Sequence, residues 1–270
     1  MLPDTTQVST LLREAAAELI LPRFQRLEAG DIQAKSPGDL VTIADIETEQ
    51  RLTPLLRDLV PGSLVVGEEA ASKDPSVLDQ LSGEKSVWVI DPVDGTANFA
   101  AGISLFAVMV SFVQAGEVVQ SWILDPVKDQ MAVAARGEGA WLDGQRLQVA
   151  PPAAPDHMSG SLALRFGNRQ LVRKIAGRSN LIGSVFSFRC AGQEYLSLAS
   201  GRAHFALYHR LLPWDHAAGW LLHREAGGYS RRLDGSDYTP RTFDGGLLLT
   251  PDETSWNALH EVLIGGEEQI

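Results

Sequence analysis

The 270-residue sequence contains a single cysteine, Cys190, so no disulfide can form within the chain. That usage excludes a disulfide-stabilised secreted scaffold and is typical of a reducing compartment. Basic residues are also scarce: 23 Lys and Arg stand against 34 Asp and Glu, which gives a formal net charge of −11. Because no basic stripe is available to neutralise a phosphate backbone, we expect no nucleic-acid partner.

Long hydrophobic runs are missing as well. The apolar patch at 15–21 is interrupted by Glu18 and has neither a basic leader nor a cleavage pattern. No run approaches the roughly 20 apolar residues that cross a bilayer. We therefore expect a cytoplasmic protein without a membrane partner. Its composition, 44% hydrophobic and 21% charged, is that of a globular protein with a large core.

Hydrophobic spacing predicts the elements of the first half of the chain. A helical pattern covers residues 5–27 with an interruption near Pro22, and a second helix begins around Asp45 and runs to about residue 59. Between them, 35–45 forms a loop or short hairpin. Apolar runs predict strands at 64–69, 87–90, 105–113, 118–124 and 131–135. The polar segment 70–83 is rich in helix and strand breakers and is predicted to be a loop.

The clearest break in composition is the proline-rich segment PPAAP at 151–155. We place a boundary there and predict two halves, 1–152 and 153–270. The first carries an antiparallel sheet, and the second alternates strand-like and helix-like stretches.

The most informative stretch is DPVDGTANF at 91–99, which follows an apolar, β-branched run that predicts a buried strand. Asp91 and Asp94 come where the strand ends, and Gly95 permits a sharp turn. Two carboxylates on one turn are electrostatically costly unless a cation lies between them, and a hard cation such as Mg²⁺ prefers oxygen ligands. The amides of Gly95 and Thr96 would then face the anion that the metal attracts. The stretch predicts a metal-assisted phosphate site.

Three further acidic residues stand out elsewhere in the sequence. Glu68 belongs to GEE at 67–69 after a predicted strand, and Asp215 belongs to WDHAAG at 214–219 before a predicted helix. Asp45 lies near a helix start. Taken alone, Glu68 reads as solvated surface, while Asp45 and Asp215 read as helix-capping residues.

DPVDGTANF resembles the signature of the inositol monophosphatase family of magnesium-dependent, lithium-sensitive phosphatases, in which Ala97 is usually Thr. The GEE and WDHAAG strings resemble two more motifs of that family. The resemblance implies an α/β (α+β) fold, a layered αβαβα sandwich of the inositol monophosphatase / fructose-1,6-bisphosphatase type, and commonly a homodimer.

The resemblance also implies a ligand set and a mechanism. Two or three Mg²⁺ ions would be held by Glu68, Asp91, the carbonyl of Val93, Asp94 and Asp215. Thr96 and Glu68 would orient a metal-activated water, with Asp45 assisting Thr96. That water would attack the phosphorus directly, without a covalent phosphoenzyme. Lys35 resembles the family's loop lysine near the site, on a loop that is one residue shorter here.

On the substrate side, the resemblance implies contacts from Asp94, Gly95, Thr96, Arg189, Tyr208 and Asp215. Tyr208 stands where these enzymes commonly carry an acidic residue that contacts the sugar ring. The implied substrate is a small phosphorylated metabolite, inositol monophosphate or a related polyol or sugar phosphate. Histidinol phosphate, a 3'(2'),5'-bisphosphonucleotide and fructose 1,6-bisphosphate stay open as alternatives.

Two rival interpretations are a different class of phosphatase and a non-catalytic relative. A phosphatase of the haloacid-dehalogenase type needs its two acids two positions apart, whereas Asp91 and Asp94 are three apart, and we reject it. A non-catalytic relative that binds a metabolite stays open, although each implied ligand and Thr96 are present in the sequence.

Overall fold

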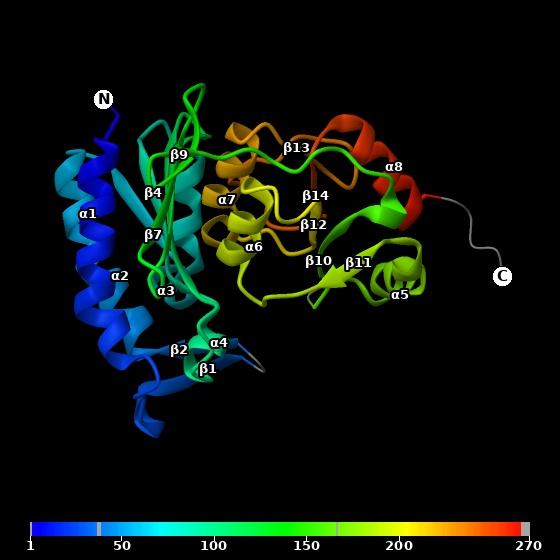
Figure 1. The fold of residues 1–270 in the computed structure, drawn as a ribbon. Helices are drawn as coiled ribbons and strands as arrows, with labels where there is room; N and C mark the ends of the chain where they lie inside the picture. The colour runs from blue at the N-terminus through cyan, green and yellow to red at the C-terminus, as the bar shows by residue number, and fades with distance from the viewer. Residues whose placement is uncertain (1, 37–38, 166, 266–270) are drawn as a thin grey trace.

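Helices and sheets alternate in layers in the computed structural model, which describes residues 2–36, 39–165 and 167–265. The layers of Figure 1 are, in order, α1 (Thr5–Ala15) with α2 (Ile43–Leu59), a seven-stranded sheet, α6 (Ala191–Ala199) with α7 (Pro213–Glu225), a five-stranded sheet, and α5 (Arg169–Arg178) with α8 (Glu253–Leu263). This arrangement confirms the predicted αβαβα sandwich.

The seven-stranded sheet has the order β3-β4-β5-β6-β7-β8-β9 and is antiparallel except for the parallel pair β3 and β4. Its strands are β3 (Leu64–Gly67), β4 (Val87–Asp94), β5 (Ala107–Gln114), β6 (Glu117–Asp125), β7 (Gln130–Ala135), β8 (Gly139–Leu142) and β9 (Gln145–Arg146). The strands predicted between 105 and 135 are confirmed.

The five-stranded sheet has the order β11-β10-β12-β14-β13. Its strands are β10 (Ser159–Ala163), β11 (Ser184–Phe186), β12 (Phe205–Tyr208), β13 (Tyr229–Arg232) and β14 (Leu247–Thr250). A separate hairpin is formed by β1 (Ile32–Ser36) and β2 (Asp39–Thr42), and two residues of that predicted hairpin, 37–38, lie outside the described residues. The proposed domain boundary at 152/153 falls in the segment between β9 and β10 and stays a prediction.

Alternating side chains explain why β4 is buried on both faces. Trp88 and Ile90 pack into the apolar cluster that includes Leu12 of α1. Val87 and Val89 point the other way, into the cluster that α6 and α7 fill. All eight residues of β4 are buried. Because both faces are packed, the end of this strand is a rigid platform for whatever follows it.

One prediction about this half is wrong. The segment 70–83, predicted to be a loop, is helical: α3 (Glu68–Lys73) is followed by a 3-10 helix at Pro75–Ser82. The cause is a contact across the fold, because the Glu49 carboxylate of α2 accepts hydrogen bonds from the amides of Glu69 and Ala70, each at 2.8 Å. Local sequence does not reveal a helix start capped from another helix.

The helical segment predicted for 5–27 ends at Arg23. Within it α1 ends at Ala15, and a π-helical segment (Ala16–Ile20) and a 3-10 turn (Leu21–Arg23) follow. None of the helices in the described ranges combines the length and the apolar character that crossing a bilayer requires.

The close contact of α6 with α7 gives a stability prediction. A methyl group on Gly219 of α7 would lie 2.0 Å from Cδ2 of Tyr195, so the Gly219→Ala variant should lose roughly 1–3 kcal/mol of unfolding free energy. Gly177 of α5 has nothing within 4 Å, and Gly177→Ala should gain about 0.5–1 kcal/mol. Urea denaturation measures the unfolding free energy of both variants. Equal changes in that free energy at the two positions would contradict the close contact of α6 with α7.

Candidate active site

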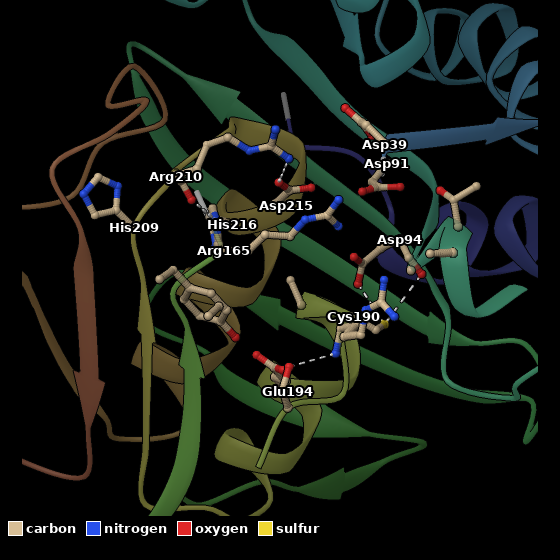
Figure 2. A pocket seen from close by; sticks show the side chains of 18 of the residues that line it. Asp39, Asp91, Asp94, Arg165, Cys190, Glu194, His209, Arg210, Asp215 and His216 are labelled. Atoms are coloured by element: carbon tan, nitrogen blue, oxygen red, sulfur yellow. Dashed lines mark hydrogen bonds and ion pairs between the residues drawn. The ribbon is translucent and has the colours of Figure 1, made fainter. Parts of the chain in front are cut away.

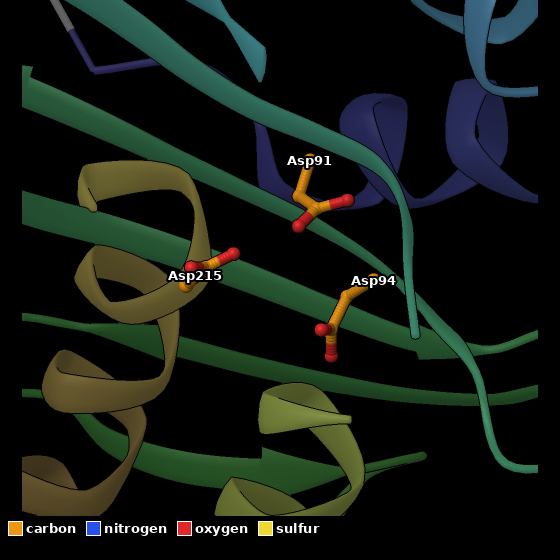
Figure 3. A group of neighbouring side chains, drawn as sticks. All are labelled: Asp91, Asp94 and Asp215. Atoms are coloured by element: carbon orange, nitrogen blue, oxygen red, sulfur yellow. The ribbon is translucent and has the colours of Figure 1, made fainter. Parts of the chain in front are cut away.

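Three carboxylates from distant parts of the chain meet at one point. Asp91 and Asp94 lie at the end of β4, and Asp215 lies in the first turn of α7. One oxygen from each lies within 4.8 Å of the others. Figure 3 shows the three side chains directed toward a common centre. We call these residues the acidic trio.

The turn after β4 depends on a glycine. Gly95 has a φ of +86°, and a Cβ there would lie 2.9 Å from the carbonyl oxygen of Leu105. The pairing of β4 with β5 also shifts register between Asp91 and Asp94. Because the strand is irregular there, the two side chains need not point to opposite faces, and both reach the same centre.

Asp215 does not cap its helix, in contrast to the capping role that local sequence suggested. Proline at Pro213 starts α7, Leu212 is the N-cap residue, and no side-chain capping hydrogen bond is present there. Asp215 is therefore the third helical residue. Its carboxylate extends from the first turn toward the other two members of the trio.

Burial and mutual repulsion raise the pKa of each carboxyl in the trio. Burial is the main cause at Asp91, and the negative charge of Glu68 and of the other trio members adds to it. Burial raises the pKa of Asp94 to about 6, although hydrogen bonds from Cys190 and Gly192 partly oppose the shift. At Asp215 burial again dominates, and Arg210 opposes it.

The trio fits a hard divalent cation. All of its donor atoms are carboxylate oxygens, the ligands that Mg²⁺ and similar ions prefer. Oδ1 of Asp91 is buried without a hydrogen-bond partner among the described residues. A buried, unpaired acceptor is costly unless a cation or a donor satisfies it.

Glu68 lines the same pocket but lies outside the trio. Its Oε1 is 2.9 Å from Nζ of Lys35, which also lies 2.6 Å from Oε1 of Glu69. Burial alone would lower the pKa of Lys35, but the two glutamates raise it, so the ammonium stays charged. The ammonium of Lys35 therefore neutralises part of the negative charge of Glu68 and Glu69. The metal-binding role of Glu68 stays a prediction.

Thr96 joins the pocket to a buried acid behind it. Its hydroxyl lies 3.1 Å from Oδ1 of Asp45 and 3.0 Å from the carbonyl oxygen of Val93. Asp45 is fully buried, and its other oxygen accepts hydrogen bonds from the amide and hydroxyl of Thr42, as in a capping box. Burial raises the pKa of Asp45 to about 7. The contact that the predicted relay needs, Thr96 with Asp45, is present.

Sequence reasoning missed the role of Cys190. The residue is buried, as expected, but its Sγ lies 2.9 Å from Oδ2 of Asp94 and donates to it. The amide of Gly192 donates to the same oxygen at 2.6 Å. Both residues open α6, more than ninety positions beyond Asp94, so no local motif could have indicated the contact.

The pocket, a cavity of about 290 Å³, has an acidic and a basic side. The predicted substrate-side residues Asp94, Gly95, Thr96, Arg189, Tyr208 and Asp215 all line it, as does Val93. Figure 2 shows the side chains of Arg165 and Arg210 extending toward Asp91, Asp94 and Asp215, whereas the ring of His209 is directed away from them. Glu194, also lining the pocket, is 3% exposed and accepts a hydrogen bond from the amide of Phe188.

Comparison with known proteins gives one consistent picture. A model of the inositol monophosphatase family matches residues 2–266. Nus factor SuhB of Pseudomonas aeruginosa is 34% identical over 228 residues, covering 82% of this chain and 83% of that protein. An inositol-1-monophosphatase of Rhizobium meliloti is 31% identical over 246 residues, covering 89% and 88%. The solved structure of extragenic suppressor protein SuhB from Bartonella henselae has a TM-score of 0.81 at 23% identity, covering 96% and 99%, which supports the fold.

The raised pKa of Asp94 predicts how the Asp94→Asn variant responds to pH in chelator. The folded-state pKa of about 6 exceeds the unfolded value of about 3.9, so the carboxyl favours folding below pH 4 and loses that contribution as pH rises through 6. The unfolding free energy of Asp94→Asn, relative to wild type, should therefore rise between about pH 4 and 6.

Comparing the two proteins removes the contribution of titrating groups that Asp94 does not influence. The Asp94 charge also raises the pKa of Asp91 and Asp215, so its removal changes the difference in the same direction. Burial lowers the pKa of His216 to about 3 and of His223 to about 4. Both histidines therefore make the unfolding free energy rise with pH, and they do so in wild type and in Asp94→Asn alike. Urea denaturation at several pH values measures the difference. The exposed Asp79→Asn variant, which does not line the pocket, is the control and should follow wild type. A constant difference between Asp94→Asn and wild type would contradict the prediction.

Proposed function

The chain belongs to the inositol monophosphatase family, whose members are phosphatases, and we propose that it uses Mg²⁺ to hydrolyse a phosphomonoester of a small metabolite. The observation that carries the proposal is the acidic trio, three carboxylates with one oxygen each within 4.8 Å of the others. One of their oxygens, Oδ1 of Asp91, is buried and has no hydrogen-bond partner among the described residues. Such a group needs positive charge at its centre, and a phosphate ester needs the same charge to be attacked by water.

We assign the acidic trio, with Glu68 and the carbonyl of Val93 from the same pocket, to hold two or three Mg²⁺ ions. When bound, these ions supply positive charge against the phosphate oxygens and lower the pKa of a bound water. The trio's chemistry supports this assignment, since each member offers a hard anionic oxygen. Cys190 donates to Asp94 and fixes that carboxylate in place.

The residues around Thr96 are suited to orient the attacking water. When its hydroxyl donates to Asp45, the oxygen of Thr96 is left to accept a hydrogen bond from that water. Glu68, on the same pocket, is the second proposed acceptor. The water adds to phosphorus while the bond to the leaving alcohol oxygen breaks, so no phosphoenzyme forms. Gly95 and Thr96 also line the pocket, and we assign their amides to the phosphate oxygens.

The substrate that we propose is inositol monophosphate or a related polyol or sugar phosphate. The relative from Rhizobium meliloti is named inositol-1-monophosphatase, which supports that choice. Family membership also leads us to propose a cytoplasmic, lithium-sensitive homodimer. A non-catalytic relative would need neither the contact of Thr96 with Asp45 nor the acidic trio.

The proposal predicts phosphate release that depends on Mg²⁺ and on the trio. Inositol 1-phosphate should be hydrolysed with Mg²⁺ and not after chelation. Asp91→Asn removes charge at the buried centre and should lower kcat/KM on the order of 10²–10³-fold, the usual loss when a preorganised electrostatic group is removed. Thr96→Ala should lower kcat with little change in KM, because the variant loses only the hydroxyl that orients the water and keeps the amide assigned to the phosphate.

The exposed Asp79→Asn variant serves as the matched control, since it makes the same chemical change away from the pocket and should retain wild-type kinetics. A screen of histidinol phosphate, adenosine 3',5'-bisphosphate and fructose 1,6-bisphosphate tests the alternative substrates. Hydrolysis that survives chelation, or no turnover of any phosphomonoester, would overturn the proposal.

A further inference from the structure

The guanidinium of Arg210 forms an ion pair with one member of the acidic trio. Its Nη2 lies 4.0 Å from Oδ2 of Asp215, and Figure 2 shows the side chain of Arg210 extending to that carboxylate. Both side chains are mostly shielded from solvent, since 34% of Arg210 and 22% of Asp215 is exposed. Salt and water screen a partly buried pair less than one at the open surface, so this positive charge acts on the trio.

Hydrogen bonds fix the backbone that carries the guanidinium. Arg210 lies in the segment between β12 and α7, and its carbonyl oxygen is 2.9 Å from Nε2 of His216. A carbonyl oxygen only accepts, so Nε2 carries a hydrogen and donates it. The amide of the next residue, Leu211, donates to the carbonyl oxygen of Phe243 at 2.8 Å. The two peptide groups that follow the Arg210 side chain are therefore held in place.

His216 is itself anchored in α7, where it directly follows Asp215. The ring is buried, and Nδ1 lies 3.1 Å from the hydroxyl oxygen of Tyr195. It also packs against the ring of Tyr208, with 4.6 Å between the ring centroids. The helix that presents the carboxylate thus also holds the segment that presents Arg210. The ion pair follows from the packing of α7.

The pair has a physical consequence for the protein without a cation. Burial, Glu68 and Asp94 raise the pKa of the Asp215 carboxyl, whereas Arg210 lowers it. The guanidinium therefore stabilises the ionised carboxylate in a place where burial and like charges oppose ionisation. It offsets part of the repulsion within the trio before any cation binds.

A divalent cation at the trio would reverse the effect of this charge. The cation would take over the interaction with Asp215 and would be repelled by the guanidinium next to that carboxylate. The residue that stabilises the cation-free site therefore weakens the affinity for a cation. Lys35 is placed differently, because it pairs with Glu68 and Glu69, neither of which belongs to the trio.

We propose that Arg210 is a built-in counter-ion of Asp215, which stabilises the cation-free protein and sets how tightly the acidic trio binds Mg²⁺. The inference rests on the proposed function, because it takes the trio to be the cation site. It concerns the regulation of cation affinity and leaves the choice of substrate unchanged.

Calorimetric titration with Mg²⁺ in the absence of substrate tests the effect on affinity. Arg210→Gln should bind Mg²⁺ roughly three- to tenfold more tightly than wild type, the size expected for a partly screened charge. Arg210→Lys keeps the positive charge and should stay within about twofold of wild type. A residue that only held the site in shape would give the opposite sign, because a disordered site binds a cation less tightly.

Urea denaturation tests the stabilising effect. In chelator, Arg210→Gln leaves Asp215 without its counter-ion, so the urea midpoint should fall below that of wild type. Saturating Mg²⁺ should then raise the midpoint of the variant more than that of wild type, because the variant binds the cation more tightly. Arg202→Gln makes the same change of charge at an exposed residue that does not line the pocket. This control should match wild type in affinity and in midpoint.

The outcomes separate the inference from the proposed function. Equal or weaker Mg²⁺ affinity in Arg210→Gln, the same gain in Arg210→Lys, or an unchanged midpoint in chelator would overturn the inference and leave the phosphatase assignment standing. Tighter binding by Arg210→Gln without hydrolysis of any phosphomonoester would support the counter-ion while the proposed function fails. If wild type binds no Mg²⁺, binding by Arg210→Gln would still support the counter-ion, and binding by neither protein would contradict both proposals.

Discussion

Repulsion among the carboxylates of the acidic trio is the interaction on which the rest of this structure depends. Unit charges 4.8 Å apart repel by roughly 3–4 kcal/mol at an effective dielectric constant of about 20, and the trio contains three such pairs. Two members are fixed because β4 is packed on both faces and ends in a turn that requires Gly95. Donation to Asp94 from Cys190 and the approach of Arg210 to Asp215 at 4.0 Å each offset part of this charge.

The fold assembles the site by placing α6 and α7 between two sheets. Both helices belong to the second half of the chain, and α7 packs against β4, β5, β6 and β7 of the first. The first turn of α7 contributes Asp215, and the start of α6 contributes the donors to Asp94. The same two helices are preceded by Arg189 and Arg210. One packing arrangement therefore sets the geometry of both the acidic and the basic side.

The resemblance to the family predicted the layered fold and the place of Asp215 in the trio, while the local pattern of an apolar strand followed by two acids and a glycine predicted Asp91 and Asp94. The sequence did not predict α3, since the start of that helix is capped by Glu49 from another helix. It identified Cys190 as a buried residue but not as a donor to Asp94, a contact between residues 96 positions apart. The cause in both cases is tertiary contact, which leaves no spacing in the sequence.

The central claim is that a divalent cation relieves the repulsion within the trio, and proton release on binding tests it most directly. At pH 6, near the pKa of Asp94, Mg²⁺ must displace protons from the carboxyls before it can bind. Calorimetric Mg²⁺ titration in two buffers of different ionisation enthalpy counts those protons. We expect a clear net release at pH 6 that decreases as the pH rises; binding without proton release at pH 6 would contradict the account.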